Sequence, residues 1–115
     1  MEKDCIFCKI AKKEVPATII YEDETAIAFS DLSPRAPIHI IVIPKLHINK
    51  LSEVSAADQD LLGHLQVVIA EISRKIPQMK DGFRVILNCG QNGGQTVGHL
   101  HYHLLGGREL KWTPG

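Results

Sequence analysis

Three histidines separated by single apolar residues, in the run His99-Leu100-His101-Tyr102-His103, are the side chains best placed to do chemistry. Successive side chains of a strand point to opposite faces, so a strand here places the imidazoles on one face, with Cα atoms about 6.6 Å apart. The apolar residues between them are expected to point into the core. Protonated imidazoles repel one another and burial penalises their charge, so a stable sheet gains little from this cluster. The pattern therefore indicates a functional site.

Two kinds of site fit the cluster. Histidines at positions i and i+2 of a strand can converge on a metal such as zinc. The preceding run CGQNGGQTVG favours phosphate instead, because its glycines permit a tight turn whose amides, with the Thr96 hydroxyl, can point at an anion. Such a run can also be a simple hairpin loop. Beside the histidines it favours phosphoryl or nucleotidyl transfer, with an imidazole as nucleophile or general acid.

The cysteines raise a separate question. Cys5 and Cys8 are close together and Cys89 is far away, an odd set that fits a reducing compartment better than a disulfide framework. A Cys-x-x-Cys pair near a helix start can be redox-active, but the thioredoxin arrangement expects a preceding strand, which is not predicted here. Free thiols or a metal site are therefore expected, and zinc fits the pair better than a redox role.

Hydrophobic periodicity and turn residues predict the elements that position these side chains. Asp4 is expected to cap a short helix over Cys5–Lys12, which cannot continue past Pro16. A Ser55/Asp58 capping box begins a long amphipathic helix that runs to Pro77. Five strands are expected, at Ile19–Tyr21, Ala26–Phe29, Ile38–Ile43, Phe83–Asn88 and Leu100–Leu105. The fold class is α+β, a mostly antiparallel five-stranded sheet with one long helix and a short N-terminal helix.

Length and charge exclude several classes of protein. A chain of 115 residues with 44% apolar residues predicts a single domain over residues 1–115. Lys plus Arg and Asp plus Glu each number 13, so no basic field is available for nucleic acid or an anionic membrane. Charges interrupt every apolar run before signal-peptide or membrane-helix length, so a cytoplasmic protein is expected.

The run HLHYHLL resembles the pattern His-φ-His-φ-His-φ-φ, with φ an apolar residue, that names the histidine triad family. The resemblance extends to CIFCKIAKKEVPA, AFSDLSPRAPIHIIVIPKLHI and LNCGQNGGQTVGHLHYHLLGGRELKWTPG, which together cover nearly the whole chain. It is strongest to the Hint-like branch. The resemblance implies a HIT-like fold and hydrolysis of purine nucleoside 5′-phosphoramidates, with adenosine preferred. It also implies a homodimer whose subunits pair their sheets, and chemistry that requires no metal.

The resemblance also assigns roles to residues. His101 matches the nucleophile that forms a transient nucleotidyl-histidine, His103 matches its neighbour at the phosphate and leaving group, and His39 matches a further histidine that supports the triad. Asp31 matches the carboxylate that accepts hydrogen bonds from the ribose hydroxyls. The apolar slot around the base matches Phe7, Ile10, Val15, Phe29 and Leu32; the phosphate contacts match Asn88, Gly94 and Thr96; and Trp112 is expected at the partner subunit's site.

For the cysteines, the resemblance to bacterial relatives implies a structural zinc site completed by His47 and His99. The ligand set Cys5, Cys8, His47 and His99 assigns the first triad histidine to structure rather than to chemistry. His64, on the long helix, has no recognisable partner in the sequence and is expected to face solvent.

Three alternatives stay open at this point. Dinucleoside polyphosphate hydrolases belong to the same family, although the WTPG ending favours a phosphoramidate hydrolase. A non-catalytic nucleotide-binding scaffold dimer would carry the same binding residues, and measured turnover distinguishes it. A metalloenzyme with zinc on all three triad histidines would lose its activity to chelators and regain it with metal.

Overall fold

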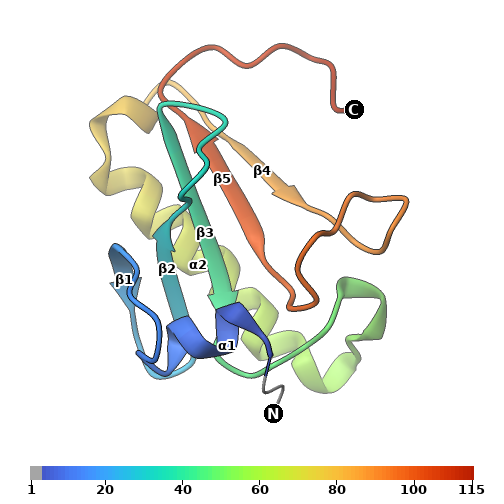
Figure 1. Ribbon diagram of the computed structural model, residues 1–115. Coiled ribbons are helices and arrows are strands. Elements are labelled where there is room, and N and C mark those ends of the chain that lie inside the picture. The colour runs from blue at the N-terminus through green and yellow to red at the C-terminus, as the bar shows by residue number, and fades with distance from the viewer. Residues whose placement is uncertain (1–3) are drawn as a thin grey trace.

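The computed structural model describes residues 4–115, so the first three residues of the predicted domain lie outside the described residues. Within this range, five strands form one sheet in the order β1-β2-β3-β5-β4, with every neighbouring pair antiparallel (Figure 1). The strands are β1 (Ile19–Glu22), β2 (Ala26–Ser30), β3 (Ile38–Pro44), β4 (Arg84–Leu87) and β5 (Tyr102–Gly106), and the helices are α1 (Ile6–Ala11) and α2 (Gln59–Lys75). The α+β prediction, with one long and one short helix, is confirmed.

The long helix α2 packs on one face of the sheet, behind it in Figure 1. Its buried residues recur at helical spacing, so they form one apolar stripe that faces the strands. The predicted Ser55/Asp58 capping box is present, but it caps the start of a short 3₁₀ turn, and this turn leads into the helix. The core on this side holds Leu65, Val68, Ile69 and Ile72 of α2 against Ala26, Ala28, Ile40, Val42, Leu100, Tyr102 and Leu104.

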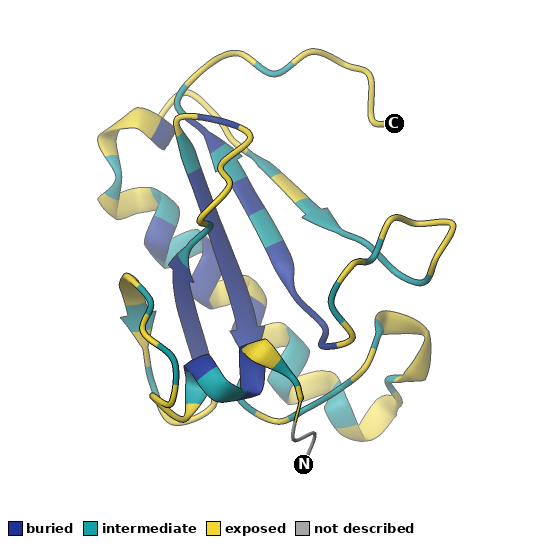
Figure 2. Cartoon of the chain, viewed as in Figure 1, coloured by how far each residue is buried: buried dark blue, intermediate teal, exposed yellow. Residues whose placement is uncertain are grey.

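The other face of the sheet carries α1, in front of β2 and β3 in Figure 1. Because side chains alternate along β3, Ile41 and Ile43 point to this face while Ile40 and Val42 point to α2. The two apolar side chains Phe7 and Ile10 of α1 pack against them. Figure 2 shows the central strands buried and the C-terminal segment largely exposed. The second, smaller core therefore ties the N-terminal helix to the central strands.

Several predicted boundaries are shifted by one or two residues, and at two of them the reason is local. The N-cap of α1 is Cys5 rather than Asp4, because the Cys5 sulfur accepts the Cys8 N–H at 3.3 Å. The last strand begins at Tyr102 rather than Leu100, because the Leu100 N–H donates to the carbonyl of Ile48 at 2.6 Å instead of joining the ladder. The predicted alternation holds across this boundary, since the apolar residues between the triad histidines lie in the core.

The expectation for His64 is also wrong. Its Nε2 lies 2.6 Å from a carboxylate oxygen of Asp23, and the same oxygen accepts the Tyr21 hydroxyl at 2.6 Å. The hydroxyl bond to the carboxylate, with burial, raises the pKa of Tyr21 to about 12. This group fastens the β1–β2 turn to α2. Among residues 4–115, no helix combines the length and apolarity that crossing a membrane requires.

Candidate active site and metal centre

A cavity of about 280 Å³ lies between α1 and the face of the sheet that α1 covers. It brings together most of the side chains that the sequence assigned to a nucleotide. Those lining it are Phe7, Ile10, Val15, Phe29, Asp31, Leu32, Thr96, His101 and His103. Ile6, Pro16, Ala17, Ser30, Ile41 and Val97 also line it and were not predicted. Of these, Ile41 could have been found, because it alternates with His39 along the same strand.

His101 is a buried, neutral imidazole with one defined free nitrogen. Its Nδ1 lies 2.7 Å from the carbonyl oxygen of His99. A carbonyl can only accept, so Nδ1 carries the proton and Nε2 keeps its lone pair. Burial lowers the pKa of His101, against the raising effects of this bond and of Asp31. Phe7 and His103 fix the ring by edge contacts, with ring centroids 5.0 and 4.9 Å away.

His103 lies next to His101 and contacts His39 on the neighbouring strand. In the ladder Ile41 pairs with His103, and Nε2 of His39 lies 2.9 Å from Nδ1 of His103. The same His39 nitrogen lies 3.4 Å from a carboxylate oxygen of Asp31. Burial lowers the pKa of His39, and burial with the neighbouring histidines lowers that of His103 to about 4. Both rings are therefore neutral at pH 7.

The glycine-rich loop is held by side-chain hydrogen bonds to its backbone and by glycines at tight positions. Asn88 donates from Nδ2 to the carbonyl of Gly93 at 2.7 Å, and a Cβ on Gly93 would overlap the carbonyl oxygen of Cys89. Gly94 has φ +80°, which favours glycine. Of the three predicted phosphate contacts only Thr96 lines the cavity; Gly94 lines an adjacent hollow of about 520 Å³, and Asn88 acts on the loop itself.

Two predicted contact residues are exposed in this chain. Leu32 lines the rim of the cavity but is 94% exposed. Trp112 is 86% exposed, in the C-terminal segment that leads away from the sheet in Figure 1. Neither side chain is held by this subunit's core, so neither shapes the cavity floor.

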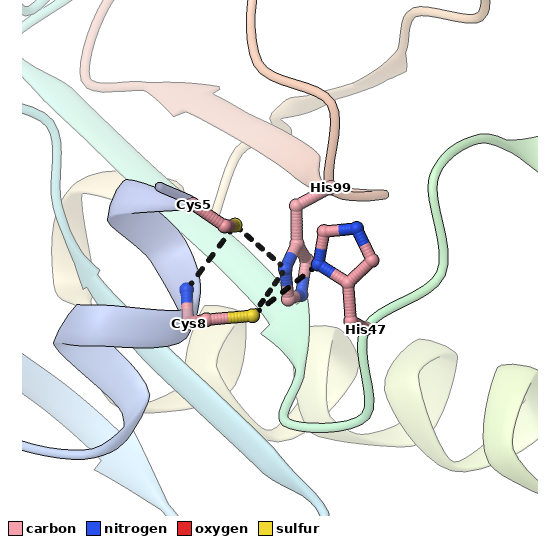
Figure 3. A group of neighbouring side chains, drawn as sticks. All are labelled: Cys5, Cys8, His47 and His99. Carbon is pink, nitrogen blue, oxygen red and sulfur yellow. Dashed lines mark hydrogen bonds between the residues drawn. The ribbon is translucent and has the colours of Figure 1, made fainter. Parts of the chain in front are cut away.

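Four N and S ligands from three separate segments meet beside the triad (Figure 3). Cys5 and Cys8 come from the start of α1, His47 from the segment after β3, and His99 from the segment before β5. Nδ1 of His99 lies 3.3 Å from the Cys5 sulfur and 3.6 Å from the Cys8 sulfur, and Nδ1 of His47 lies 3.2 Å from the Cys8 sulfur. A tetrahedral zinc with ordinary bond lengths separates such N and S ligands by about 3.5 Å, so the spacing fits the ion.

Outer hydrogen bonds present the correct nitrogens to this cluster. Nε2 of His99 donates to the carbonyl of Pro44 at 2.8 Å, and Nε2 of His47 donates to Oδ1 of Asn49 at 2.8 Å. Asn49 donates from Nδ2 to Glu53 at 3.2 Å, which fixes the orientation of its amide. Both Nδ1 lone pairs therefore face the sulfurs, as in zinc sites with an outer hydrogen-bond shell. The four residues form a group that can hold a metal ion, compatible with zinc.

This placement disfavours a zinc ion on all three triad histidines. Both nitrogens of His99 are directed away from His101, one to the sulfurs and one to Pro44. A second group, Asp31, His39 and His103, also has its ligand atoms close enough to hold a cation. Its His39–His103 contact of 2.9 Å is a hydrogen bond in this structure.

Comparison with known proteins agrees with this geometry. The HIT domain model matches residues 12–110. An uncharacterised HIT-like protein of Synechococcus elongatus is 50% identical over 115 residues, all of both chains. A structure described as a HIT family hydrolase from Legionella pneumophila is 41% identical with TM-score 0.95, and the match covers 97% of this chain and 100% of that one. A histidine triad protein from Clostridium difficile is 49% identical with TM-score 0.93, covering 96% of each chain.

Three observations have one explanation: the five-stranded antiparallel sheet, the triad whose middle histidine lines a cavity, and the matches over nearly the whole length. The chain belongs to the HIT family, and its fold is that of the family's hydrolases.

Proposed function

We propose that this protein hydrolyses purine nucleoside 5′-phosphoramidates, adenosine derivatives first, through a nucleotidyl group carried on His101. One observation carries the proposal: the Nδ1–H of His101 is held by the His99 carbonyl at 2.7 Å, in a residue that lines the cavity. The free Nε2 of a neutral imidazole is a nucleophile without prior loss of a proton. The lowered pKa keeps it so at neutral pH.

The cavity walls suit a single nucleoside. Phe7, Ile10 and Phe29 offer apolar surface for a purine ring. Asp31 stands at the cavity with a carboxylate, an acceptor that ribose hydroxyls can donate to. One of its oxygens is held by the Ser33 N–H at 2.7 Å, which orients the carboxylate. Base, ribose and phosphate would then lie in line from α1 to the histidines.

The reaction proceeds in two displacements at the α-phosphorus. Nε2 of His101 forms a bond to phosphorus while the P–N bond of the substrate breaks, and the leaving nitrogen takes a proton from water to depart as an amine. Water then attacks the same phosphorus, the bond to His101 breaks, and a proton returns to solvent. The Nδ1–H of His101 stays on the His99 carbonyl throughout. Dividing the hydrolysis in this way replaces one slow attack by water with two easier steps.

The test is to trap the intermediate and to compare leaving groups. We expect a 5′-adenylyl adduct on His101 by mass spectrometry, with a higher kcat/KM for adenosine phosphoramidates than for diadenosine polyphosphates. His101→Ala should lower turnover by about 10³-fold or more, while AMP binds with an unchanged Kd, because the cavity walls and Asp31 remain. His64→Ala, on α2 and away from the cavity, is the matched control and should keep its rate.

Three results would contradict the proposal. Near-native rates in His101→Ala would move the nucleophile to another residue. A higher specificity constant for dinucleotides would assign the protein to the polyphosphate hydrolases. AMP binding without turnover of any of these substrates would favour a non-catalytic nucleotide-binding scaffold.

We also propose that zinc occupies the site made by Cys5, Cys8, His47 and His99. Two thiolates and two neutral imidazoles make a closed tetrahedral shell without a position for substrate, which is the mark of a structural ion. Such an ion would cross-link three segments of the chain and would take part in no step of the reaction. Thiolate ligands persist in a reducing compartment, so we place the protein in the cytoplasm.

A homodimer is the proposed assembly. β4 is an edge strand with unpaired backbone groups, and it carries the exposed side chain of Val85. Such an edge accepts a second sheet. The exposed Trp112 and the C-terminal segment would then reach the neighbouring subunit's cavity.

A further inference from the structure

We infer that the peptide N–H of Arg35 acts through His39 to fix the proton of His103 on Nε2, so that His103 presents a hydrogen-bond donor to the substrate's phosphate. Arg35 and His39 are then positioning residues. The inference rests on the proposed function for the identity of the ligand. The tautomers themselves can be measured without it.

The first step is the bond from Arg35 to His39. The peptide N–H of Arg35 points at Nδ1 of His39, with a distance of 3.0 Å. A peptide nitrogen can only donate, so Nδ1 of His39 must be the acceptor and carries no proton. A neutral imidazole has one N–H, and that of His39 is therefore on Nε2.

The second step is that the tautomer of His39 determines the tautomer of His103. Nε2–H of His39 has two acceptors in reach, Nδ1 of His103 at 2.9 Å and the carboxylate of Asp31 at 3.4 Å. The shorter distance is a good N–H···N hydrogen bond and the longer one is not. Nδ1 of His103 is thus an acceptor without a proton. The single N–H of neutral His103 is on Nε2, the nitrogen left for the cavity that this residue lines.

The rings have little freedom to exchange these roles. His39 is 7% exposed and lies in β3, and His103 lies in the adjoining β5. The carbonyl of Arg35 accepts from the Arg108 guanidinium at 3.2 Å, which restrains the residue whose N–H is the donor, on the far side of its Cα. Burial and the nearby Arg35 guanidinium both lower the pKa of His39 and of His103. A doubly protonated ring is disfavoured, so the two neutral tautomers decide the outcome.

The tautomer of His103 determines whether a phosphate oxygen faces a hydrogen-bond donor or a lone pair. With the proton on Nε2, His103 donates to an anionic phosphoryl oxygen, a bond stronger than one between neutral groups. The opposite tautomer would turn a lone pair toward the anion. Giving the Nε2 proton away would leave an imidazolate beside the phosphate, so the geometry makes His103 a donor and leaves protonation of the amine to water.

The sharpest test removes one N–H. Replacing residue 35 by lactic acid turns its peptide into an ester, and Arg35→Ala is the matched control because the two proteins differ only in N–H against O. We expect the ester to bind AMP about tenfold more weakly than the control, or weaker still, with unchanged affinity for adenosine, which lacks the phosphate. Equal AMP affinity in the two proteins would overturn the inference.

A second measurement needs no variant. The ¹⁵N chemical shifts of the histidine rings in the wild-type protein distinguish a protonated from an unprotonated nitrogen. We expect Nε2 to carry the only proton in both His39 and His103 at pH 7. A proton on Nδ1 of either ring would overturn the inference. This result is independent of turnover: a wild-type protein that hydrolyses no phosphoramidate would refute the proposed function and leave the tautomers to be judged on their own shifts.

Discussion

His101 and His103 take part in the proposed reaction as neutral imidazoles, and burial keeps them neutral at pH values where an exposed histidine is charged. The pKa of His103 is lowered to about 4, and that of His101 is lowered as well. An exposed histidine has a pKa near 6.5, and its neutral fraction would fall about tenfold between pH 7 and 5.5. The lowered pKa values move that loss to more acidic conditions.

We therefore expect kcat/KM to fall less between pH 7 and 5.5 than the roughly tenfold loss of an ordinary histidine, with the larger fall at lower pH. The measurement is initial rate at low substrate concentration, corrected for acid hydrolysis of the substrate without enzyme. A tenfold loss over this interval would mean that an essential histidine has its ordinary pKa, and would contradict the buried, neutral nucleophile.

The N-terminal helix depends on its surroundings more than on its own sequence. Six residues are too few for a stable isolated helix, so α1 is held by packing and by its cysteines. Phe7 of this helix contacts the rings of both His99 and His101. The helix therefore joins the candidate metal site to the candidate active site, and loss of the proposed zinc should loosen both.

Replacing both cysteines tests this element. For Cys5→Ser with Cys8→Ser we expect loss of bound zinc and a Tm lower by about 5–15 °C, because the ion's binding energy is part of the folding energy. Well below that temperature, kcat should fall far less than in His101→Ala. Cys89→Ser, outside the cluster, is the control and should keep both zinc and Tm.

Elemental analysis measures the bound zinc, and calorimetry measures Tm. A wild-type protein that carries no zinc after metal supplementation, or a double variant that melts like the parent, would remove the metal site. Cys5 and Cys8 would then be ordinary packing residues of α1.

Elements with strong periodicity were predictable, and contacts between distant segments were not. The stripe of α2 and the alternation of β3 and of Leu100, Tyr102 and Leu104 follow from residue type alone. The start of β5 does not, because a bond from Leu100 to Ile48 ends the ladder. The partnership of His64 with Asp23 is likewise a contact across 41 positions.

The candidate site divides in the same way. The triad that contains His101 was recognisable by residue type and spacing, and Asp31 through the resemblance to the family. The donor on Arg35 was not, because it is a peptide N–H that any residue except proline supplies. The roles of Asn88 and Gly94 were also obscured, since their bonds and φ angle shape a loop whose path the sequence alone does not fix.

At the scale of the whole molecule, one subunit leaves its C-terminal segment largely exposed to solvent. Arg84 of β4 donates to the carbonyl of Lys111 at 2.5 Å, which ties Lys111 to the edge strand. The residues that follow are exposed, including Trp112. A large aromatic side chain that no contact of its own subunit covers gains stability only where a second surface meets it.

The proposed dimer supplies that surface, and deleting residues 111–115 tests it. Sedimentation of the wild-type protein should give twice the chain mass, and the truncated protein should stay dimeric because the edge strand β4 is intact. Its ratio of kcat/KM between bulky and small leaving groups should change by about threefold or more, since the segment is expected to line the partner's cavity. Trp112→Ala separates the indole from the rest of the segment. A monomeric wild type would refute the dimer, and an unchanged ratio in both variants would remove Trp112 from substrate selection.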